Sequence, residues 1–308
     1  MKMIFKKIKY LLFSLFLFIA GSGFAQQDSQ FTQYMYNTAI LNPAYAGSRG
    51  VLSMNGIYRN QWVGMEGAPE TMTFSINSPV GLKGVGLGAN FYSDKIGPSI
   101  ESNITADFSY TIRVSTETRL SFGLKGGINL LDVDVNKLNI YDPNDVNLVS
   151  TNIKSPVAGV GLYLHSDRWY LGLSSPNFLE TKHYDEIAVS TATEKAHIYF
   201  IGGYVFNLNE EFKFKPAVLT KMVSGAPLSV DLSANVMYRE KFTLGVAYRY
   251  DVTFSGLTGF QISDGLMLGY AYDYDTTELG NYHSGSHEIF LRFELGTRTR
   301  STINPRFF

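Results

Sequence analysis

Asp132, Asp134 and Asn136 alternate with valines and form the chain's nearest approach to a metal-binding motif. Carboxylate and amide oxygens are the ligands that calcium prefers, and EF-hand loops carry them at this spacing. Such a loop needs glycine where this chain has Lys137, and it ends on a glutamate that does not follow here. We therefore interpret the stretch as a solvated acidic loop, keep a weak calcium site as the alternative, and predict no cofactor.

Residues that support catalysis do not fall into a recognisable set. His283 and His287 would share a face only on a helix, and Gly285 between them argues against a helix. The sequence has no G-x-S-x-G nucleophile motif and no cysteine. The glycines of segment 84–88 lie in an alternating strand pattern and open no helix, so they do not predict a phosphate loop. We predict that the protein is not an enzyme.

Charged side chains on the polar faces of alternating segments are the stronger candidates. In segment 103–113, Ile104, Phe108 and Tyr110 alternate with polar residues, which gives a strand one apolar and one polar face. The pattern recurs at 229–239 and 241–251. These charges either form ion pairs that only stabilise a wall, or line a binding channel. On polar faces we place Asp107, Arg113, Lys125, Asp231, Arg239, Arg249, Asp251 and Asp273.

Fourteen such segments run along the chain, and an even number is expected of a single-chain bacterial barrel. Besides the three above, they lie near residues 50–60, 70–78, 84–93, 119–130, 156–165, 168–174, 196–206, 211–222, 257–262, 265–275 and 286–296.

Connections between these segments also alternate in length. The connections after even-numbered segments are short, whereas long ones at 131–154, 175–195 and 275–285 follow odd-numbered segments. Outer-membrane barrels have short periplasmic turns and long outer loops, and a soluble β-sandwich has no reason to sort its loops in this way. We predict an all-β fold, a transmembrane antiparallel β-barrel of about fourteen strands over residues 49–296.

The N-terminus indicates export. Lysines precede an apolar run at 11–20, and small residues up to Ala25 follow, so we predict a signal peptide over 1–25. No later stretch is long and apolar enough for a membrane helix. Charged residues make up 17% of the chain, below the usual quarter, and a net charge of −1 argues against nucleic acid as a partner. We predict the outer membrane of a Gram-negative bacterium, with its lipid as a partner.

The segment after the signal peptide carries a family resemblance. Residues 30–37 and 42–48 contain Gln33, Tyr34 and Asn37, then the string Asn-Pro-Ala-Tyr-Ala-Gly, and Tyr-Arg-Asn-Gln-Trp follows at 58–62. Together with the glycine-rich strands and the final Pro-Arg-Phe-Phe, these motifs resemble the PorP/SprF family along essentially the whole chain. The resemblance implies an outer-membrane barrel of the type IX secretion and gliding motility system. The candidate residues it adds are Asn42, Pro43, Tyr45, Gly47, Arg59 and Trp62.

Both ends of the mature chain fall outside the alternating pattern. Residues 26–48 lack strand character, and within them 29–41 suit a short helix, because Pro43 disfavours helix just before it. We favour a plug of the periplasmic mouth over a docking segment. The arginine-bearing tail 297–308 is predicted to be periplasmic, either contacting secretion machinery or simply frayed.

Two functions from different classes remain open. The resemblance implies a non-enzymatic barrel that anchors an exported surface protein through its C-terminal domain, or that links to the secretion and gliding machinery. The alternative is an outer-membrane channel or transporter for small or hydrophobic solutes. The two differ in whether the lumen is open, which conductance measures.

Overall fold

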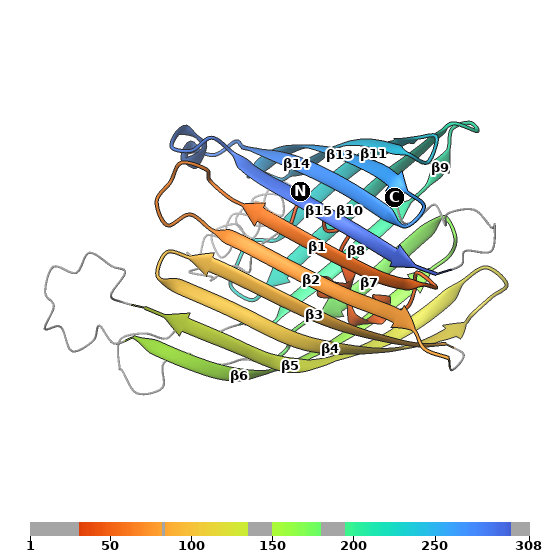
Figure 1. Cartoon of the computed structure of the whole chain (residues 1–308), viewed down its shortest axis with the longest axis horizontal. Coiled ribbons are helices and arrows are strands. Elements are labelled where there is room, and N and C mark those ends of the chain that lie inside the picture. The colour runs from red at the N-terminus through yellow and green to blue at the C-terminus, as the bar shows by residue number, and fades with distance from the viewer. Residues whose placement is uncertain (1–30, 82–83, 135–149, 180–194, 297–308) are drawn as a thin grey trace, which may run out of the picture.

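Alternating segments of the sequence become paired strands of one antiparallel sheet (Figure 1). The computed structural model describes residues 31–81, 84–134, 150–179 and 195–296. The predicted signal peptide, the tail 297–308 and most of the two longest loops lie outside these ranges. The strands are β1 (Leu52–Asn60), β2 (Glu70–Pro79), β3 (Val85–Ile96), β4 (Ser99–Arg113), β5 (Arg119–Val133), β6 (Thr151–His165), β7 (Trp169–Ser175), β8 (His197–Tyr204), β9 (Phe206–Asn207), β10 (Phe212–Val223), β11 (Ser229–Tyr238), β12 (Phe242–Arg249), β13 (Thr253–Ser263), β14 (Leu266–Asp275) and β15 (Ser286–Leu295).

The sheet closes on itself. Apart from the short β9, each strand pairs with its neighbours in the chain, β1 pairs with β15, and β10 pairs with both β8 and β11. The two-residue β9 continues the line of β8 after a break, so the barrel has the fourteen strands that the sequence predicts. The break lies where Pro216, which has no N–H to donate, interrupts the ladder of β10 between its pairings with β8 and β9.

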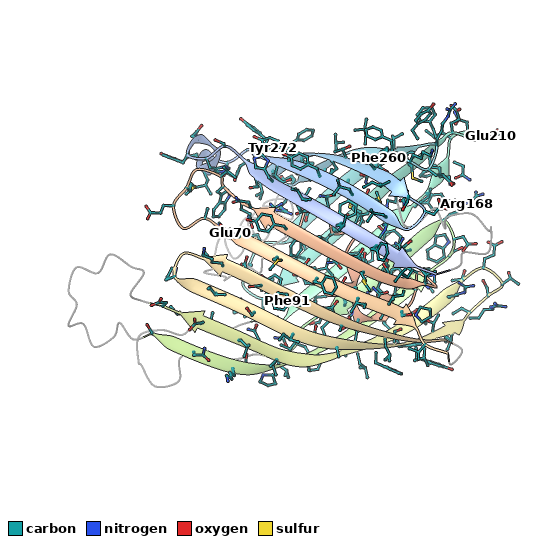
Figure 2. The ribbon with its side chains drawn as sticks, in the orientation of Figure 1. Glu70, Phe91, Arg168, Glu210, Phe260 and Tyr272 are labelled. Carbon is teal, nitrogen blue, oxygen red and sulfur yellow. The ribbon has the colours of Figure 1, made fainter. Side chains whose placement is uncertain are left out.

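The two faces of the wall follow the alternation. Large apolar side chains such as Phe260 and Tyr272 are exposed on the outside (Figure 2), and Phe108 is exposed as well. Their polar neighbours, among them Ser109 and Ser255, are buried inside. Burial is therefore inverted relative to a soluble protein, as expected where lipid is the solvent. In the described residues no helix is long and apolar enough to cross a membrane.

The two ends of the barrel differ. At one end, here called the turn end, short connections join β2 to β3, β4 to β5, and β6 to β7. The other end, the loop end, carries the connections 61–69, 134–150, 176–196 and 276–285. Two loop-end connections, 97–98 and 250–252, are also short, so length alternates less regularly than predicted.

Strands β3 to β6 extend further toward the loop end than their sequence pattern predicts. β4 begins at Ser99 instead of residue 103, and β6 begins at Thr151 instead of residue 156. The added residues are paired although their polarity no longer alternates, because beyond the bilayer neither face of a strand needs to be apolar.

Depth in the membrane, rather than exposure, should decide the cost of a charge on the outer wall. Leu291 lies in the middle of β15 and is 47% exposed, whereas Leu228 lies in the connection before β11 and is 55% exposed. We expect Leu291→Arg to cost about 2–4 kcal/mol and Leu228→Arg about 0–1 kcal/mol. The folded fraction, measured by heat-modifiable gel migration, checks this. Equal losses for the two variants would mean that β15 does not present Leu291 to lipid.

Candidate functional site

The lumen of the barrel is occupied by the chain's own N-terminal segment, residues 31–48, here called the lumen segment. Nearly all of it is buried, and Gln33, Asn42 and Ala44 have no measurable exposure. It contains one turn of helix, α2 (Thr38–Leu41), and a 3-10 turn, η1 (Pro43–Tyr45). The helix is shorter than the predicted 29–41, because lumen side chains rather than helical bonds satisfy much of this backbone.

The family string at 42–47 is fitted to the wall by hydrogen bonds. Asn42 is extended, as the residue before proline should be, and its side-chain oxygen accepts from Ala44 N at 2.9 Å. Its side-chain nitrogen donates to Leu162 O on β6 at 2.9 Å. Gly47 has φ 71°, and its N–H donates to the Asn77 side chain on β2 at 3.2 Å. The string thus turns the chain and attaches it to the wall.

Glycines on the wall make room for this string. A Cβ added at Gly123 would lie 2.0 Å from Ala44 N, one at Gly161 2.1 Å from Asn42 Oδ1, and one at Gly86 2.2 Å from Ala46 O. No side chain fits at such distances, so these strands need glycine where the lumen segment approaches them. The space that these inward-facing glycines leave in the lumen is occupied by the lumen segment of the same chain.

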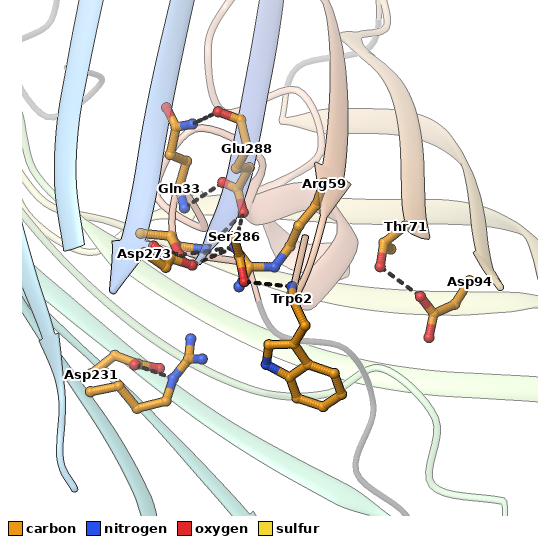
Figure 3. A network of polar contacts seen from close by, with 11 residues as sticks. Gln33, Arg59, Trp62, Thr71, Asp94, Asp231, Asp273, Ser286 and Glu288 are labelled. Atoms are coloured by element: carbon orange, nitrogen blue, oxygen red, sulfur yellow. Dashed lines mark hydrogen bonds and ion pairs between the residues drawn. The ribbon is translucent and has the colours of Figure 1, made fainter. Parts of the chain in front are cut away.

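A buried polar cluster fixes the lumen segment near the loop end (Figure 3). Glu288 on β15 accepts from the backbone N–H groups of Thr32 at 3.0 Å and Gln33 at 2.8 Å. Asp273 on β14 accepts from the Thr32 hydroxyl at 2.7 Å. The Arg59 guanidinium on β1 lies 2.6 Å from Asp273 and 3.0 Å from Glu288. One cation and several donors thus satisfy two buried carboxylates, which is the condition for burying charge without a large cost.

A second set of contacts holds the segment toward the turn end. Arg49 forms a buried ion pair with Glu294 on β15 and donates to the Tyr45 hydroxyl at 3.3 Å. The Ser109 hydroxyl on β4 donates to Ala46 O at 2.7 Å. The lumen segment therefore runs between the two ends and is not confined to a plug of one mouth. Its turn-end anchorage follows from the covalent link to β1, which begins there.

Aromatic contacts fill the middle of the lumen. Tyr36 stacks on Phe290 of β15, with ring centroids 4.2 Å apart and planes 10° apart. The Lys215 ammonium and the Arg292 guanidinium lie 5.8 and 5.9 Å from the Tyr36 ring, within the range of cation–π attraction.

Most of the predicted lumen charges point inward and are paired. Asp107 and Lys125 are directly opposite on β4 and β5, 3.7 Å apart, and Lys125 also donates to Ile40 O of the lumen segment at 2.8 Å. Asp231 and Arg249 are directly opposite on β11 and β12, at 2.6 Å.

Four other candidates lie away from the lumen interior. Arg239 and Asp251 are exposed turn residues with φ of 49° and 55°, and Arg239 pairs with exposed Glu211 outside the lumen. Their lumen placement was wrong, because both were counted as continuations of strands that had already ended. Arg113 is exposed on the turn-end rim. Trp62 lies in the loop after β1, where its backbone N–H donates to the Ser286 hydroxyl at 3.2 Å.

Several residues of the site were missed in the sequence. Glu288, Arg292 and Glu294 lie on the inward face of β15, and the residues between them, Ile289, Leu291 and Phe293, lie on the outward face. The alternation that revealed other lumen charges could therefore have found these three charges. Lys215 could have been found in the same way, since it alternates with Phe212 and Phe214 in the predicted segment 211–222, whereas Arg49 precedes β1 and carries no such signal.

The weak calcium candidate is only partly described. Asp132 lies near the end of β5, opposite Asn152 of β6, and Asn136 lies outside the described residues. Within the described ranges no three acidic, histidine or cysteine side chains gather as a metal site would require.

Two cavities flank the lumen segment. Toward the loop end, a cavity of about 100 Å³ is lined by Phe31, Leu41, Tyr199, Glu101 and Lys125, among others. At the turn end, a cavity of about 560 Å³ is lined by Gly47, Ser48, Arg113, Arg119 and His165, among others.

Comparison with known proteins identifies the family. Residues 23–293 match the family described as type IX secretion system membrane protein PorP/SprF. The chain belongs to this family. It is an outer-membrane β-barrel associated with type IX secretion. Among curated protein sequences, none matches the chain significantly.

Solved structures of outer-membrane proteins are similar to this PorP/SprF barrel, and the CymD channel shares its fold. The CymD monoaromatic hydrocarbon channel is 13% identical, with 89% of this chain and 93% of that chain covered and a TM-score of 0.51. The outer membrane protein Omp33 of Acinetobacter baumannii is 8% identical, with 80% and 98% covered and a TM-score of 0.49. At such identities the likeness concerns the fold alone.

The glycine fit can be tested on β5, where two glycines face opposite ways. A Cβ at Gly126 meets no atom within 4 Å, whereas one at Gly123 overlaps the lumen segment. We expect Gly126→Val to leave folding unchanged and Gly123→Val to cost about 1–3 kcal/mol through overpacking. Displacement of the segment should also raise conductance in planar bilayers. Identical folding and conductance of the two variants would contradict the fit.

The Arg59 cluster should matter far more for stability than an exposed ion pair. Arg59→Met leaves Asp273 and Glu288 buried without their cation, a change that typically costs about 3–5 kcal/mol. The control is Arg239→Met, whose pair with Glu211 is exposed and should contribute about 0–1 kcal/mol. Urea unfolding of the purified PorP/SprF barrel in detergent measures both. A loss below about 1 kcal/mol for Arg59→Met would show that water readily replaces the arginine.

Proposed function

We propose that this PorP/SprF barrel is a non-enzymatic accessory protein that holds an exported protein at the cell surface, with its loop end outside. The observation that carries the proposal is the lumen segment, which is buried and fixed near both ends. It occupies the path that a solute would take. The rims and loops then remain as the surfaces on which a partner can bind, and loops on a rigid scaffold commonly serve that role.

The loop end offers a backbone edge as well as loops. β6 pairs with β7 only from Val160 to His165, although it pairs with β5 from Thr151 onward. Among the described residues, 151–157 have no strand partner on the β7 side. An extended segment of an exported protein can add a strand to such an edge, gaining main-chain hydrogen bonds over a long contact. This supports capture of a protein chain rather than of a small molecule.

The turn end offers positive charge to a periplasmic partner. Arg113 and Arg119 are directly opposite each other on β4 and β5, and both are exposed. Like charges in that arrangement repel, and neither has an ion pair among the described residues. Carboxylates on a component of the secretion machinery would relieve this repulsion through bidentate contacts.

The second candidate function is a solute channel. It draws support from the name of the CymD channel, whose fold resembles this one, and the name describes that protein only. A conducting lumen would require the lumen segment to leave, which breaks the contacts of Glu288 with Thr32 and Gln33. We therefore favour the anchoring function.

Loss of the protein should release one exported surface protein and leave small-solute uptake unchanged. Affinity purification of the tagged chain from native outer membrane should recover that same protein, and the purified barrel should not form a stable open pore. The matched control is expression of the Gly126→Val variant in the cells that lack the protein, which should restore retention of the surface protein. If cells without the protein retain every surface protein but no longer take up one nutrient, the channel function would be established instead.

A further inference from the structure

The outer wall carries an apolar groove near the turn end, where β7, β8, β10 and β11 lie side by side. Its volume is about 530 Å³, and its floor includes Gly202 and Pro216. Larger side chains form its walls, among them Leu171, Val218 and Leu232.

Local sequence explains why the wall is hollow here. Gly202 is the outward-facing partner of Leu171 on one side and of Val218 on the other, so a position without a side chain lies between two branched ones. Pro216 interrupts the ladder of β10 close by. The outward positions of β12 to β15 instead carry large exposed apolar residues, such as Leu244, Phe260 and Leu291.

The groove ends at an aromatic pair. Trp169 of β7 is directly opposite Tyr204 of β8, and the Tyr204 ring lies 4.6 Å from that of Phe206. Tryptophan and tyrosine gather where membrane meets water. The groove therefore runs inward from the membrane surface at the turn end.

A cation lies just beyond this pair. Arg168 precedes Trp169, is exposed, and accepts a backbone hydrogen bond from Val205 at 2.7 Å through its carbonyl. Its guanidinium has no ion pair among the described residues, and Figure 2 places it at the turn end of the barrel. A free guanidinium at the level of the lipid headgroups is suited to bind a phosphate.

The width of the groove decides its occupant. Neighbouring strands lie about 4.8 Å apart, so the backbones of Leu171 and Val218 stand roughly 10 Å apart across Gly202. Their own side chains reduce this width, which leaves too little room for a helix of about 10–12 Å diameter. A single acyl chain is narrower and is what surrounds the barrel at this depth.

We propose that the groove is a binding site for a phospholipid, with one acyl chain over Gly202 and the phosphate on Arg168. Moving an acyl chain from the bilayer into the groove yields no hydrophobic gain, because lipid tails are as apolar as the wall. Retention therefore depends on the fit of the chain in the hollow and on the Arg168–phosphate contact. This site lies outside the lumen and is independent of the function proposed above.

Native mass spectrometry of the full chain, purified in mild detergent, tests the site. The wild type should retain a phospholipid, and Gly202→Leu should lose it because the new side chain occupies the groove. The matched control, Gly256→Leu, places the same side chain on the lipid-facing wall of β13, where a Cβ meets no atom within 4 Å, and should retain the lipid. Arg168→Gln should lose it without filling the groove.

Heat-modifiable migration confirms that each variant is folded before lipid is counted. If Gly202→Leu fails to fold, the test rests on Arg168→Gln. Its control is Lys241→Gln, which removes a charge from another exposed turn and should retain the lipid. Equal retention by wild type, Gly202→Leu and Arg168→Gln overturns the proposal. Recovery of an acylated protein in place of phospholipid overturns it as well, because the groove would then hold a protein's lipid anchor.

Discussion

Closure of the backbone ladder is the constraint on which the rest of this structure depends. In the hydrocarbon core of a membrane, an unpaired N–H or C=O has no water to bind, so a sheet that crosses it must pair its first strand with its last. Here β1 meets β15, and β10 joins β8 to β11. A closed wall of this size has a lumen wider than that of an eight-stranded barrel, which side chains fill. The wall's own side chains are therefore not enough to fill the lumen of this barrel.

The lumen segment provides that material, and the wall is shaped to receive it. Gly123 and Gly161 leave room where the Ala44 backbone and the Asn42 side chain come closest. Glu288 supplies the acceptor that the Thr32 N–H needs, and Arg59 balances its charge. Two further inward ion pairs, Asp107 with Lys125 and Asp231 with Arg249, join residues that lie directly opposite each other across the ladder. Register therefore determines the electrostatics of the lumen as well as the hydrogen bonding of the wall.

Much of the fold was predictable because a strand with lipid on one side repeats every two residues. That periodicity identified fourteen strands and the inward direction of Asp107, Asp231 and Asp273. It could not locate strand ends outside the bilayer, where β4 continues to Ser99 without alternation. It also extended strands into turns and so misplaced Arg239 and Asp251. Periodicity also could not predict that Arg59 pairs with Glu288, because that contact joins the first strand to the last.

The lumen segment differs from a gate in how it is held. It is continuous with β1 at the turn end and bound to β14 and β15 near the loop end, so its withdrawal requires breaking contacts far from the covalent link. Hydrogen bonds to charged groups contribute about 1.5–3 kcal/mol each, and the cluster at Thr32 and Gln33 contains several. To shift a two-state equilibrium almost completely, a partner must bind one state more tightly than the other by about 5.5 kcal/mol. The free energy lost when these hydrogen bonds break together is of similar size. Under the proposed anchoring function, a partner that binds the filled barrel at its rims and loops avoids this cost.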